Sequence, residues 1–416
     1  MFNVITKAPG TDHDVAKPVM GRPAPRDVFP PLTVGIEEEF LLMDPQTGRA
    51  LPVAKQVLRR IDGPIADQVA PELTKFQIET NSAVHTDLRQ LGVDLLELRS
   101  VASAAAASVG AGLAACGTCL AGNGGMPPLS SSPRYRHMYG HYRALLCGQG
   151  VCGCHVHVGI ADREEAIQVS NHARPWLPLL QALTGNSPIA DGMDTGYTSW
   201  RAMLWARWPS AGPPPLFSSA EHYDALVDAL HASGAILDRG MVYWLIRLSE
   251  HLPTLEFRTA DTCATVEEAT MLAGLVRALA STALADVRRG VPAPQIDQTL
   301  LCAAYWRAAR DGMEGDAFDL LSGRRMPTWS LVGRLLDRVR QSLKSSGDLP
   351  LVTAALRRLQ RRGSGAARQR AAYHRRNQLA DVARLVLQET LAIPEFPDDG
   401  VSSRGLLPPA FRPLEA

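Results

Sequence analysis

The sequence has almost no net charge, because 43 Lys and Arg residues offset 42 Asp and Glu residues to a formal charge of +1. A partner selected by bulk electrostatics, whether nucleic acid or a membrane surface, is therefore not expected. The apolar fraction of 46% and the charged fraction of 20% are typical of globular proteins. A chain of 416 residues is also long enough to bury a substantial core.

The sequence also has few cysteines. Seven Cys, an odd number, are scattered over the chain, which excludes a disulfide scaffold as the basis of the fold. No positively charged start followed by an apolar segment is present, so we expect a cytoplasmic protein. Cys116 and Cys119 have the spacing of a redox pair, but no strand precedes them. Small buried thiols are therefore favoured over a redox motif.

One long stretch, residues 101–122, has no charged side chain. It reaches the length of a membrane span. Its residues are mostly Ala, Gly and Ser, however, and Leu113 and Leu120 are its only leucines. Such a segment gains little from lipid and packs closely against protein, so it predicts a buried helix.

Periodicity and turn residues predict an α+β protein with a mainly antiparallel sheet. A flexible Pro/Gly-rich tail (1–30), a single domain (31–395) and a Pro-rich C-terminal tail (396–416) are expected. The predicted elements are strands at 33–43, 75–80, 151–160, 241–248 and 253–260, helices at 88–120, 162–184 and 220–233, a loop at 185–217, and amphipathic helices over 265–391. Asp162 is the expected N-cap of the second helix.

Three predicted strands carry ionisable residues two positions apart, in GIEEEFLL, CGCHVHVG and TLEFRTAD. Side chains alternate between the faces of a strand, so each pair projects from one face. The pairs are Glu37 with Glu39, His155 with His157, and Glu256 with Arg258. Carboxylates and imidazoles together suit divalent metal ions, and arginine suits a phosphate or carboxylate. The pattern predicts an active-site face, from which Glu38 points away.

Simpler interpretations exist for each pair. GIEEEF by itself is equally typical of an edge strand with a solvated charged face. The segment ELTKFQIET adds Glu72 and Glu79, and this signal is weak when taken alone. Cys152 and Cys154 beside the histidines suggest a zinc site, but the spacing is poor for one. Ligand or substrate roles for His155 and His157 are favoured over simple exposure, because two solvated imidazoles between valines and glycines are unusual.

Two other segments suggest binding. The loop around Tyr197, Ser199 and Arg201 combines aromatic, hydroxyl and guanidinium groups, which suit the mouth of a pocket for an anionic small molecule. Tryptophan packing under a long loop is the alternative, and the loop's length favours function. Eight Arg lie between residues 357 and 376. Nucleic-acid binding is one interpretation, but the near-zero net charge favours a solvated helix face, with one or two of the side chains expected within reach of nucleotide phosphates.

Together these motifs resemble the carboxylate–amine ligase family, also called glutamate–cysteine ligase type 2. The resemblance runs from about Thr33 to Leu391 and follows the family order through GIEEEF, ELTKFQIET, CGCHVHVGIADREEA, WLPLLQALTGNSP, DTGYTSWR, RWPSAGPPP, LPTLEFRTAD and GAARQR. It implies a curved, mainly antiparallel sheet backed by helices, as in glutamine synthetase, and makes residues 31–395 one catalytic domain. It also implies an ATP-dependent ligase that joins a carboxylate to an amine through an acyl phosphate, with two or three Mg²⁺ or Mn²⁺ ions.

The resemblance also assigns roles to residues. It implies Glu256 and Arg258 as catalytic residues, and as metal ligands Glu37, Glu39, Glu72, Glu79, His155 and Glu256. On the nucleotide side it implies His157, Arg258, Gln369 and Arg370. For the acid substrate it implies Arg201, Tyr197 and Ser199.

The expected substrates are the γ-carboxyl of glutamate and cysteine, with no nucleic acid or membrane partner. A different acid, amine or peptide is an open alternative, as is a non-catalytic nucleotide- or metal-binding relative. A zinc-binding module built on the cysteines is a third interpretation. Association into homo-oligomers stays open.

Overall fold

The computed structural model describes residues 31–122 and 125–397. These residues belong to the second of two compact units of the chain, Met1–Pro30 and Pro31–Ala416. The predicted N-terminal tail lies outside the described residues, as does the predicted C-terminal tail from residue 398 onwards. Phe396 is described and lies under the guanidinium of Arg89, so the packed chain extends at least to this residue.

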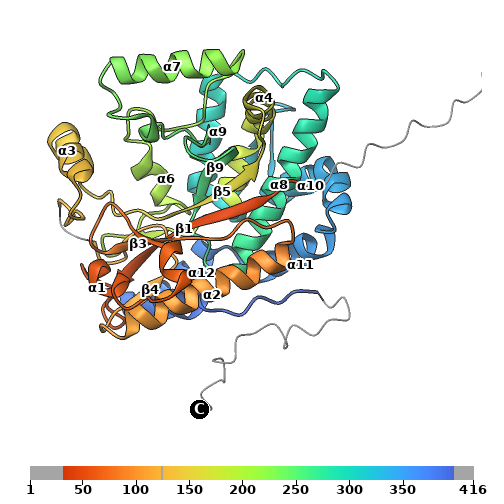
Figure 1. Cartoon of the computed structure of the whole chain (residues 1–416). Coiled ribbons are helices and arrows are strands. Elements are labelled where there is room, and N and C mark those ends of the chain that lie inside the picture. The colour runs from red at the N-terminus through yellow and green to blue at the C-terminus, as the bar shows by residue number, and fades with distance from the viewer. Residues whose placement is uncertain (1–30, 123–124, 398–416) are drawn as a thin grey trace, which may run out of the picture. The chain divides into compact units, whose positions relative to one another are not determined.

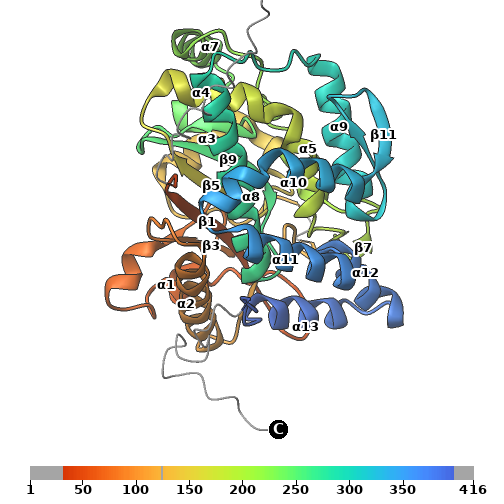
Figure 2. The same ribbon diagram turned by 90° about the vertical axis from the view of Figure 1, so that its right-hand side faces the viewer.

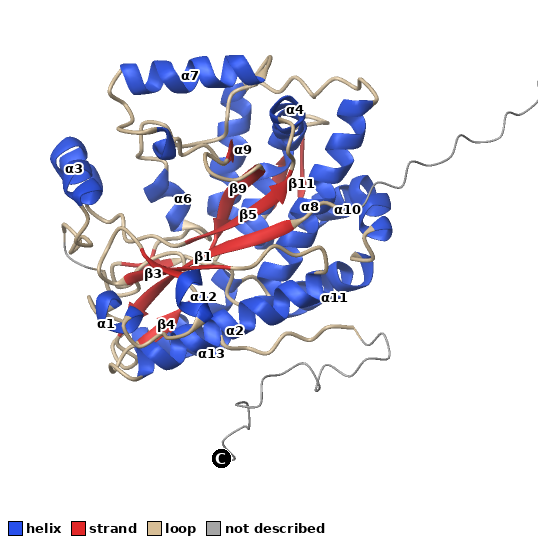
Figure 3. Ribbon diagram, viewed as in Figure 1, coloured by secondary structure: helices blue, strands red, loops and turns tan. Residues whose placement is uncertain are grey.

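A seven-stranded antiparallel sheet forms the centre of the described chain (Figure 1). Six strands follow one another in the order β2-β3-β1-β5-β9-β8, and β4 also pairs with β1. Their bounds are β1 Val34–Met43, β2 Val69–Pro71, β3 Gln77–Asn81, β4 Gly112–Ala114, β5 Gly153–Gly159, β8 Ile246–Leu248 and β9 Thr254–Asp261. Figure 3 shows β1, β5 and β9 side by side. The predicted α+β fold class is confirmed.

Short strands and helices make up the rest. Two small antiparallel pairs are β6 Ile189–Ala190 with β7 Met193–Asp194, and β10 Asp316–Asp319 with β11 Arg324–Pro327. The helices are α1 Ala54–Leu58, α2 Leu88–Ala107, α3 Pro133–Tyr142, α4 Arg163–Ala173, α5 Leu177–Leu183, α6 Trp200–Trp205, α7 Ala220–Ala232, α8 Val266–Arg288, α9 Gln298–Asp311, α10 Thr328–Ser345, α11 Leu349–Arg362, α12 Gly365–Arg376 and α13 Leu379–Thr390.

Helix α8 is the main support of the sheet. It contacts β5 and β1, and α2, α4, α10 and α11 pack against it. Figure 2 shows α8 beside β5 with α10 and α11 next to it. Apolar residues of the strands and of α8 share one core, in which Val156, Phe257 and Leu275 are at most 1% exposed. This packing holds the three strands that carry the ionisable pairs as one rigid platform.

Local capping explains where several helices begin. The Asp162 carboxylate accepts a hydrogen bond from the backbone N–H of Glu165 at 2.9 Å, so its predicted N-cap role at α4 is confirmed. Asp87 caps α2 in the same way, through the N–H groups of Arg89 and Gln90. Thr265 caps α8 directly after β9. These caps fix the points at which the chain leaves the sheet.

The predicted helix over 88–120 is wrong beyond Ala107. The chain turns at Gly110, whose φ is +78°, and returns as β4, which pairs with β1. Glycine adopts this left-handed conformation without steric cost, so the Ala-rich composition does not carry the helix further. Residues 101–122 are therefore the end of a helix followed by a short strand and a loop.

Four other regions differ from the predictions. The helix expected over 162–184 is divided into α4 and α5 around Pro175 and Pro178, which cannot continue a helical hydrogen-bond ladder. The loop expected over 185–217 contains β6, β7 and α6. The region after 265 contains the hairpin β10–β11 among its helices, and the strand expected over 241–248 is only β8.

Among the described residues, one helix is long and apolar enough to span a membrane, α8. Of its most apolar window, 78% is buried inside the protein. A helix that is covered by the sheet and by neighbouring helices is typical of a protein core, and the same test is passed by core helices in general. The stretch that the sequence analysis singled out, residues 101–122, does not form such a helix.

Candidate active site

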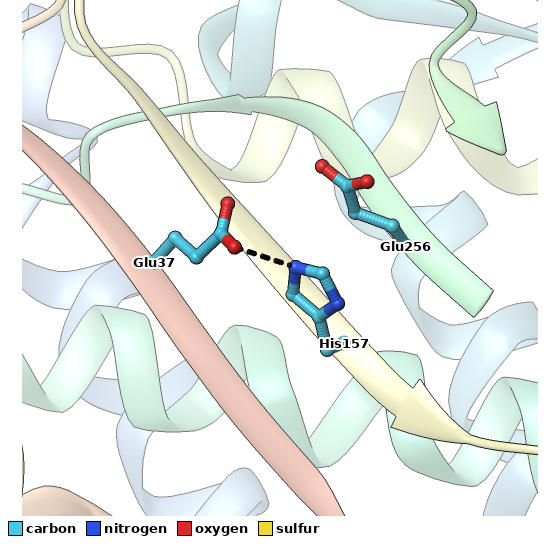
Figure 4. A group of neighbouring side chains, drawn as sticks. All are labelled: Glu37, His157 and Glu256. Carbon is cyan, nitrogen blue, oxygen red and sulfur yellow. Dashed lines mark ion pairs between the residues drawn. The ribbon is translucent and has the colours of Figure 1, made fainter. Parts of the chain in front are cut away.

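Ionisable side chains from three adjacent strands meet on one face of the sheet. Glu37 on β1, His157 on β5 and Glu256 on β9 each offer a ligand atom within 4.8 Å of the others (Figure 4). The register explains this meeting, because Glu37 lies opposite His155, and His157 lies opposite Glu256. Glu39 in turn lies opposite Glu79 of β3. We call the surface formed by these residues and Arg258 the site face.

His155 lies at the centre of the site face. Its Nδ1 is 3.2 Å from a Glu37 oxygen and 3.8 Å from a Glu256 oxygen, and its Nε2 is 4.0 Å from Glu39. His157 Nε2 is 3.1 Å from the other Glu37 oxygen, and its Nδ1 contacts the Thr254 hydroxyl at 2.9 Å. Both imidazoles are buried. The two histidines thus share Glu37.

Glu256 is held between two guanidinium groups. Arg247 Nε donates to one of its oxygens at 2.7 Å, and Arg258 donates to the other. Burial alone raises the pKa of this carboxyl, but the adjacent Arg258 and Arg247 outweigh it and lower the pKa to about 2. Glu256 is therefore an anion at any physiological pH.

The imidazoles are not equivalent. Burial opposes ionisation of Glu37, but hydrogen bonds from His155 and His157 outweigh burial and lower its pKa. Burial also disfavours the charged form of each imidazole. For His155 burial and then the Arg258 charge lower the pKa, whereas for His157 the Glu37 and Glu256 carboxylates overcome burial and raise it. His155 is therefore better suited to act as a neutral ligand.

Two further carboxylates come from the β2–β3 region. Glu79 lies on β3, and Glu72 lies between the two strands, near the Tyr135 hydroxyl at 3.4 Å. Burial and then the Glu39 charge raise the pKa of Glu72 to about 7. Burial and the charges of Glu37, Glu72 and Glu39 raise the pKa of Glu79 well above its usual value. Carboxylates crowded in this way favour a bound cation.

A cavity of about 180 Å³ opens over the site face. One wall is acidic, with Glu37, Glu39, Glu72 and Glu79. A second group of lining residues is aromatic and cationic, and consists of Arg134, Tyr135, Trp205, Trp208, Tyr243, Arg247 and Arg258. A ligand with both cationic and anionic parts, such as a metal–phosphate complex, matches these two groups of residues.

The residues of the site face fit a divalent metal. The buried His155 Nε2 has no hydrogen-bond partner among the described residues and lies 4.0 Å from Glu39. A buried polar atom without a partner costs free energy that a ligand recovers. Carboxylate oxygens with imidazole nitrogens are donors that Mn²⁺ and Mg²⁺ accept. Glu37, His157 and Glu256, whose ligand atoms lie within 4.8 Å of one another, therefore fit a metal. The ligand roles of Glu39, His155, Glu72 and Glu79 stay predictions.

Of the predicted substrate residues, Arg201 contacts a residue that lines this cavity, Trp205. Arg201 is buried, 4.0 Å from Asp261 and over the Trp205 ring. The Ser199 hydroxyl donates to Asp261 at 2.7 Å and caps α6. The Tyr197 hydroxyl contacts Trp306 at 3.3 Å. None of the three predicted residues lines the cavity, and their substrate role stays a prediction.

The predicted nucleotide residues on α12 are also placed apart from the site face. Gln369 is buried and donates to Asn186 at 2.7 Å. Arg370 pairs with Asp194 at 3.0 Å and donates to the Tyr197 carbonyl at 2.8 Å. They tie α12 to the loop before α6, and their nucleotide role stays a prediction.

No disulfide joins the seven cysteines, all of which lie in the described part of the chain. Cys116 is buried, and burial followed by the Cys119 charge raises its pKa. Cys119 is half-buried and lines a second cavity of about 510 Å³ together with Cys147 and Trp200. Among the described residues, no cluster of cysteines that could hold a metal ion is present.

Sequence reasoning missed several residues of the site. Arg247, the second partner of Glu256, stands between Ile246 and Leu248 in a strand that was predicted, so its alternation was the available signal. Tyr243 also lines the cavity, and its ring lies 4.7 Å from that of Trp205, which belongs to the tryptophan-containing loop expected at a pocket. No sequence spacing identifies Tyr243, because it comes from a different segment.

The fold and the site face define the class of protein. The architecture is that of glutamine synthetase-like ligases. It superimposes on a glutamate–cysteine ligase from Francisella tularensis in complex with AMP, with a TM-score of 0.64, 15% identity and coverage of 87% of this chain and 89% of that one. A bifunctional glutathione synthetase from Pasteurella multocida gives a TM-score of 0.66 at 14% identity over 87% of this chain. The match spans 53% of that bifunctional enzyme.

The sequence comparisons identify the family. Residues 33–387 match the model of glutamate–cysteine ligase family 2, and the chain belongs to this family of ligases. A protein of Saccharopolyspora erythraea named "Putative glutamate–cysteine ligase 2-1" is 47% identical over 374 residues, which cover 90% of this chain and 97% of the relative. A Salinispora arenicola relative is 48% identical over 82% of this chain and 89% of its own length. The predicted family, fold class and ligase class are confirmed.

Proposed function

We propose that the protein is an ATP-dependent ligase that joins the γ-carboxyl group of glutamate to the amine of cysteine. The observation that carries this proposal is the site face, on which Glu37, Glu39, His155 and Arg258 from adjacent strands line one cavity, with His157 and Glu256 next to them. The names of the family and of its relatives support the choice of substrates. The neutral condensation is uphill in water, so coupling to ATP supplies the driving force.

In the proposed reaction the γ-phosphoryl group of ATP is transferred to the substrate carboxylate, which gives an acyl phosphate and ADP. The amine then attacks the acyl carbon, loses a proton and displaces phosphate. Two or three Mg²⁺ or Mn²⁺ ions, when bound, neutralise the triphosphate and the charge on the transferred group. Their proposed ligands are Glu37, Glu39, Glu72, Glu79, His155 and Glu256.

Arg258 is the residue proposed to stabilise the negative charge on the transferred phosphoryl group. Its guanidinium lies on the cavity wall, next to Glu256, and its buried Nε has no hydrogen-bond partner among the described residues. A planar guanidinium group with an N–H donor that is still unpaired is suited to bind a phosphoryl oxygen. His157, which already reaches Glu37, either binds a nucleotide phosphate or joins the metal ligands.

Further parts of the proposal lie outside the cavity. Gln369 and Arg370 are proposed on the nucleotide side, and Arg201, Tyr197 and Ser199 toward the acid substrate. Binding at these positions requires ligand groups that extend beyond the cavity. We also propose a cytoplasmic setting, where ATP and Mg²⁺ are available.

The amine acceptor is the least determined part of the reaction. Another acid or amine with the same chemistry is the second candidate. A relative that binds nucleotide without turnover is disfavoured, because all of the ionisable pairs converge on the site face.

The decisive measurement is ADP release with Mg²⁺ and ATP, first with glutamate alone and then with a panel of amines that includes cysteine. Turnover that requires glutamate and cysteine together supports the proposal. Turnover with another amine corrects the acceptor only. Absence of ATP binding, measured by calorimetry on the same protein, overturns the assignment.

A further inference from the structure

The middle carboxylate of GIEEEF faces away from the cavity and is fully buried. Glu38 is 0% exposed, and so is its partner Arg99 on α2. The two side chains form a bidentate ion pair, with Nε–Oε2 and Nη2–Oε1 distances of 2.9 and 2.5 Å. This geometry is the strongest that a carboxylate and a guanidinium adopt.

Arg99 also holds two other parts of the chain. It donates to the carbonyl oxygens of Cys263 at 2.9 Å and Ala264 at 3.4 Å, directly after β9, and to that of Thr390 at the end of α13 at 3.2 Å. A guanidinium has five N–H donors. Arg99 therefore uses all of them, and one side chain connects β1 to the segment that continues β9.

The connected strands are those that carry the site face. Glu38 lies between Glu37 and Glu39 on β1, while Cys263 follows the strand that carries Glu256 and Arg258. Strand β5 lies between β1 and β9 in the sheet. The Thr262 hydroxyl reinforces the connection, because it lies 2.7 Å from the Glu39 carbonyl and 3.0 Å from the Gly153 carbonyl. The opposite side of the sheet is thus tied across the three strands.

We propose that Glu38 and Arg99 are positioning residues that set the spacing between the β1 carboxylates and the β9 carboxylate for metal binding. The inference rests on the proposed function, since it assigns the site face to a divalent metal. Metal–oxygen distances tolerate only small errors, so a shift of β1 against β9 separates ligands that come from different strands. Supporting residues behind metal ligands typically change metal affinity about 10–100-fold.

A purely structural role is the alternative, since any buried ion pair that loses one partner destabilises a protein. The chain offers a matched control in Arg277 and Asp348, which form a buried pair at 2.5 Å between α8 and the start of α11. Neither residue lines the catalytic cavity. Asp348→Asn is therefore expected to cost stability without moving the site face.

The test is calorimetric titration of the full chain with Mn²⁺ alone, for the wild type, Glu38→Gln, Arg99→Lys and Asp348→Asn. We expect both Glu38→Gln and Arg99→Lys to raise the Kd for Mn²⁺ by about tenfold or more. Asp348→Asn should leave the Kd within about twofold of the wild type, at a comparable loss of thermal stability. Equal weakening in all three variants, or an unchanged Kd in folded Glu38→Gln, overturns the inference.

A second variant covers the case in which the single substitutions do not fold. The double change Glu38→Leu with Arg99→Met removes both charges together, which often restores stability. It also removes the tie to Cys263, so Mn²⁺ should still bind at least about tenfold more weakly. Wild-type affinity in this folded variant contradicts the inference. A wild type that binds no Mn²⁺ contradicts the proposed metal site itself, and therefore the proposed function.

Discussion

Consecutive glutamates on β1 have opposite surroundings. Glu38 and Arg99 on the helix side satisfy one another, and Arg99 uses every donor that it has. On the site face, the buried Nε2 of His155 and the Nε of Arg258 have no hydrogen-bond partner among the described residues. A closed ion pair serves the fold, whereas buried groups left open are suited to a ligand.

The largest expected effect is the loss of activity when a residue of the site face is changed. Glu256→Gln removes a charge that the proposed metal needs, with little change in volume. We expect ATP turnover to fall by about 10²–10³-fold or more while the fold stays intact. ADP release and circular dichroism measure the two properties. Glu250→Gln, which alters a carboxylate paired with Arg239 outside the cavity, is the control. Full activity of Glu256→Gln contradicts the metal assignment.

Arg258→Lys tests the other half of the same ion pair. Lysine keeps the charge but has no planar fork, so it cannot hold Glu256 and a phosphoryl oxygen together. We expect kcat to fall about 10²-fold, and the KM for ATP to change less. Steady-state kinetics measure both. A normal kcat in this variant assigns Arg258 to structure rather than to catalysis.

Substitutions in the ion pair of Glu38 and Arg99 are expected to lower the stability of the fold. Arg99→Met leaves Glu38 charged and buried without a partner, which costs about 3–5 kcal/mol of unfolding free energy. Arg258→Met should cost less, because Glu256 keeps Arg247 and one Arg258 donor is already unpaired. Urea unfolding of the metal-free protein measures the difference. Equal losses of unfolding free energy in Arg99→Met and Arg258→Met contradict the expectation that the two sides of the sheet differ in this way.

The acidic wall makes stability depend on pH. Burial and the nearby Glu39 raise the pKa of Glu72 to about 7 from an ordinary 4.5. Between these values the folded chain binds more protons than the unfolded chain, so stability falls as the pH rises through this window. Glu72→Gln should flatten the fall, as measured by urea unfolding with a chelator at about pH 5 and about pH 8. If the pH dependence of stability is the same in Glu72→Gln as in the wild type, the raised pKa of Glu72 is contradicted.

The smallest effect is expected among the aromatic residues that line the cavity. The buried indole N–H of Trp205 has no hydrogen-bond partner among the described residues, whereas that of Trp208 donates to Gln149 at 3.1 Å. Trp208→Phe leaves Gln149 without this donor and should cost about 1 kcal/mol more than Trp205→Phe. Thermal melts of the two variants, which alter neighbouring rings in one cavity, give the comparison. A larger loss of thermal stability for Trp205→Phe than for Trp208→Phe contradicts the expected contribution of the hydrogen bond between Trp208 and Gln149.

Part of the site was readable from local pattern, because strand alternation has a period of two. That period places Glu37 and Glu39 on one face and Glu38 on the other without knowledge of the fold. The end of α2 was not predicted, since the Ala-rich run has high helix propensity and the decisive feature is the turn at Gly110. For Arg201, the sequence motif was recognised but the surroundings were not predicted. Its burial beside Asp261 depends on a strand that is distant in the sequence.

The sequence alone determined β1, β5 and β9, their polar pairs, the capping at Asp162 and, through motif order, the family. Only the tertiary structure decided which residues meet, above all Glu37 with His157 and Glu256, and Arg99 with Glu38. The physical reason is that β1, β5 and β9 are more than 90 residues apart in the chain. Their register is set by burial of the apolar faces against α8, which local sequence does not encode.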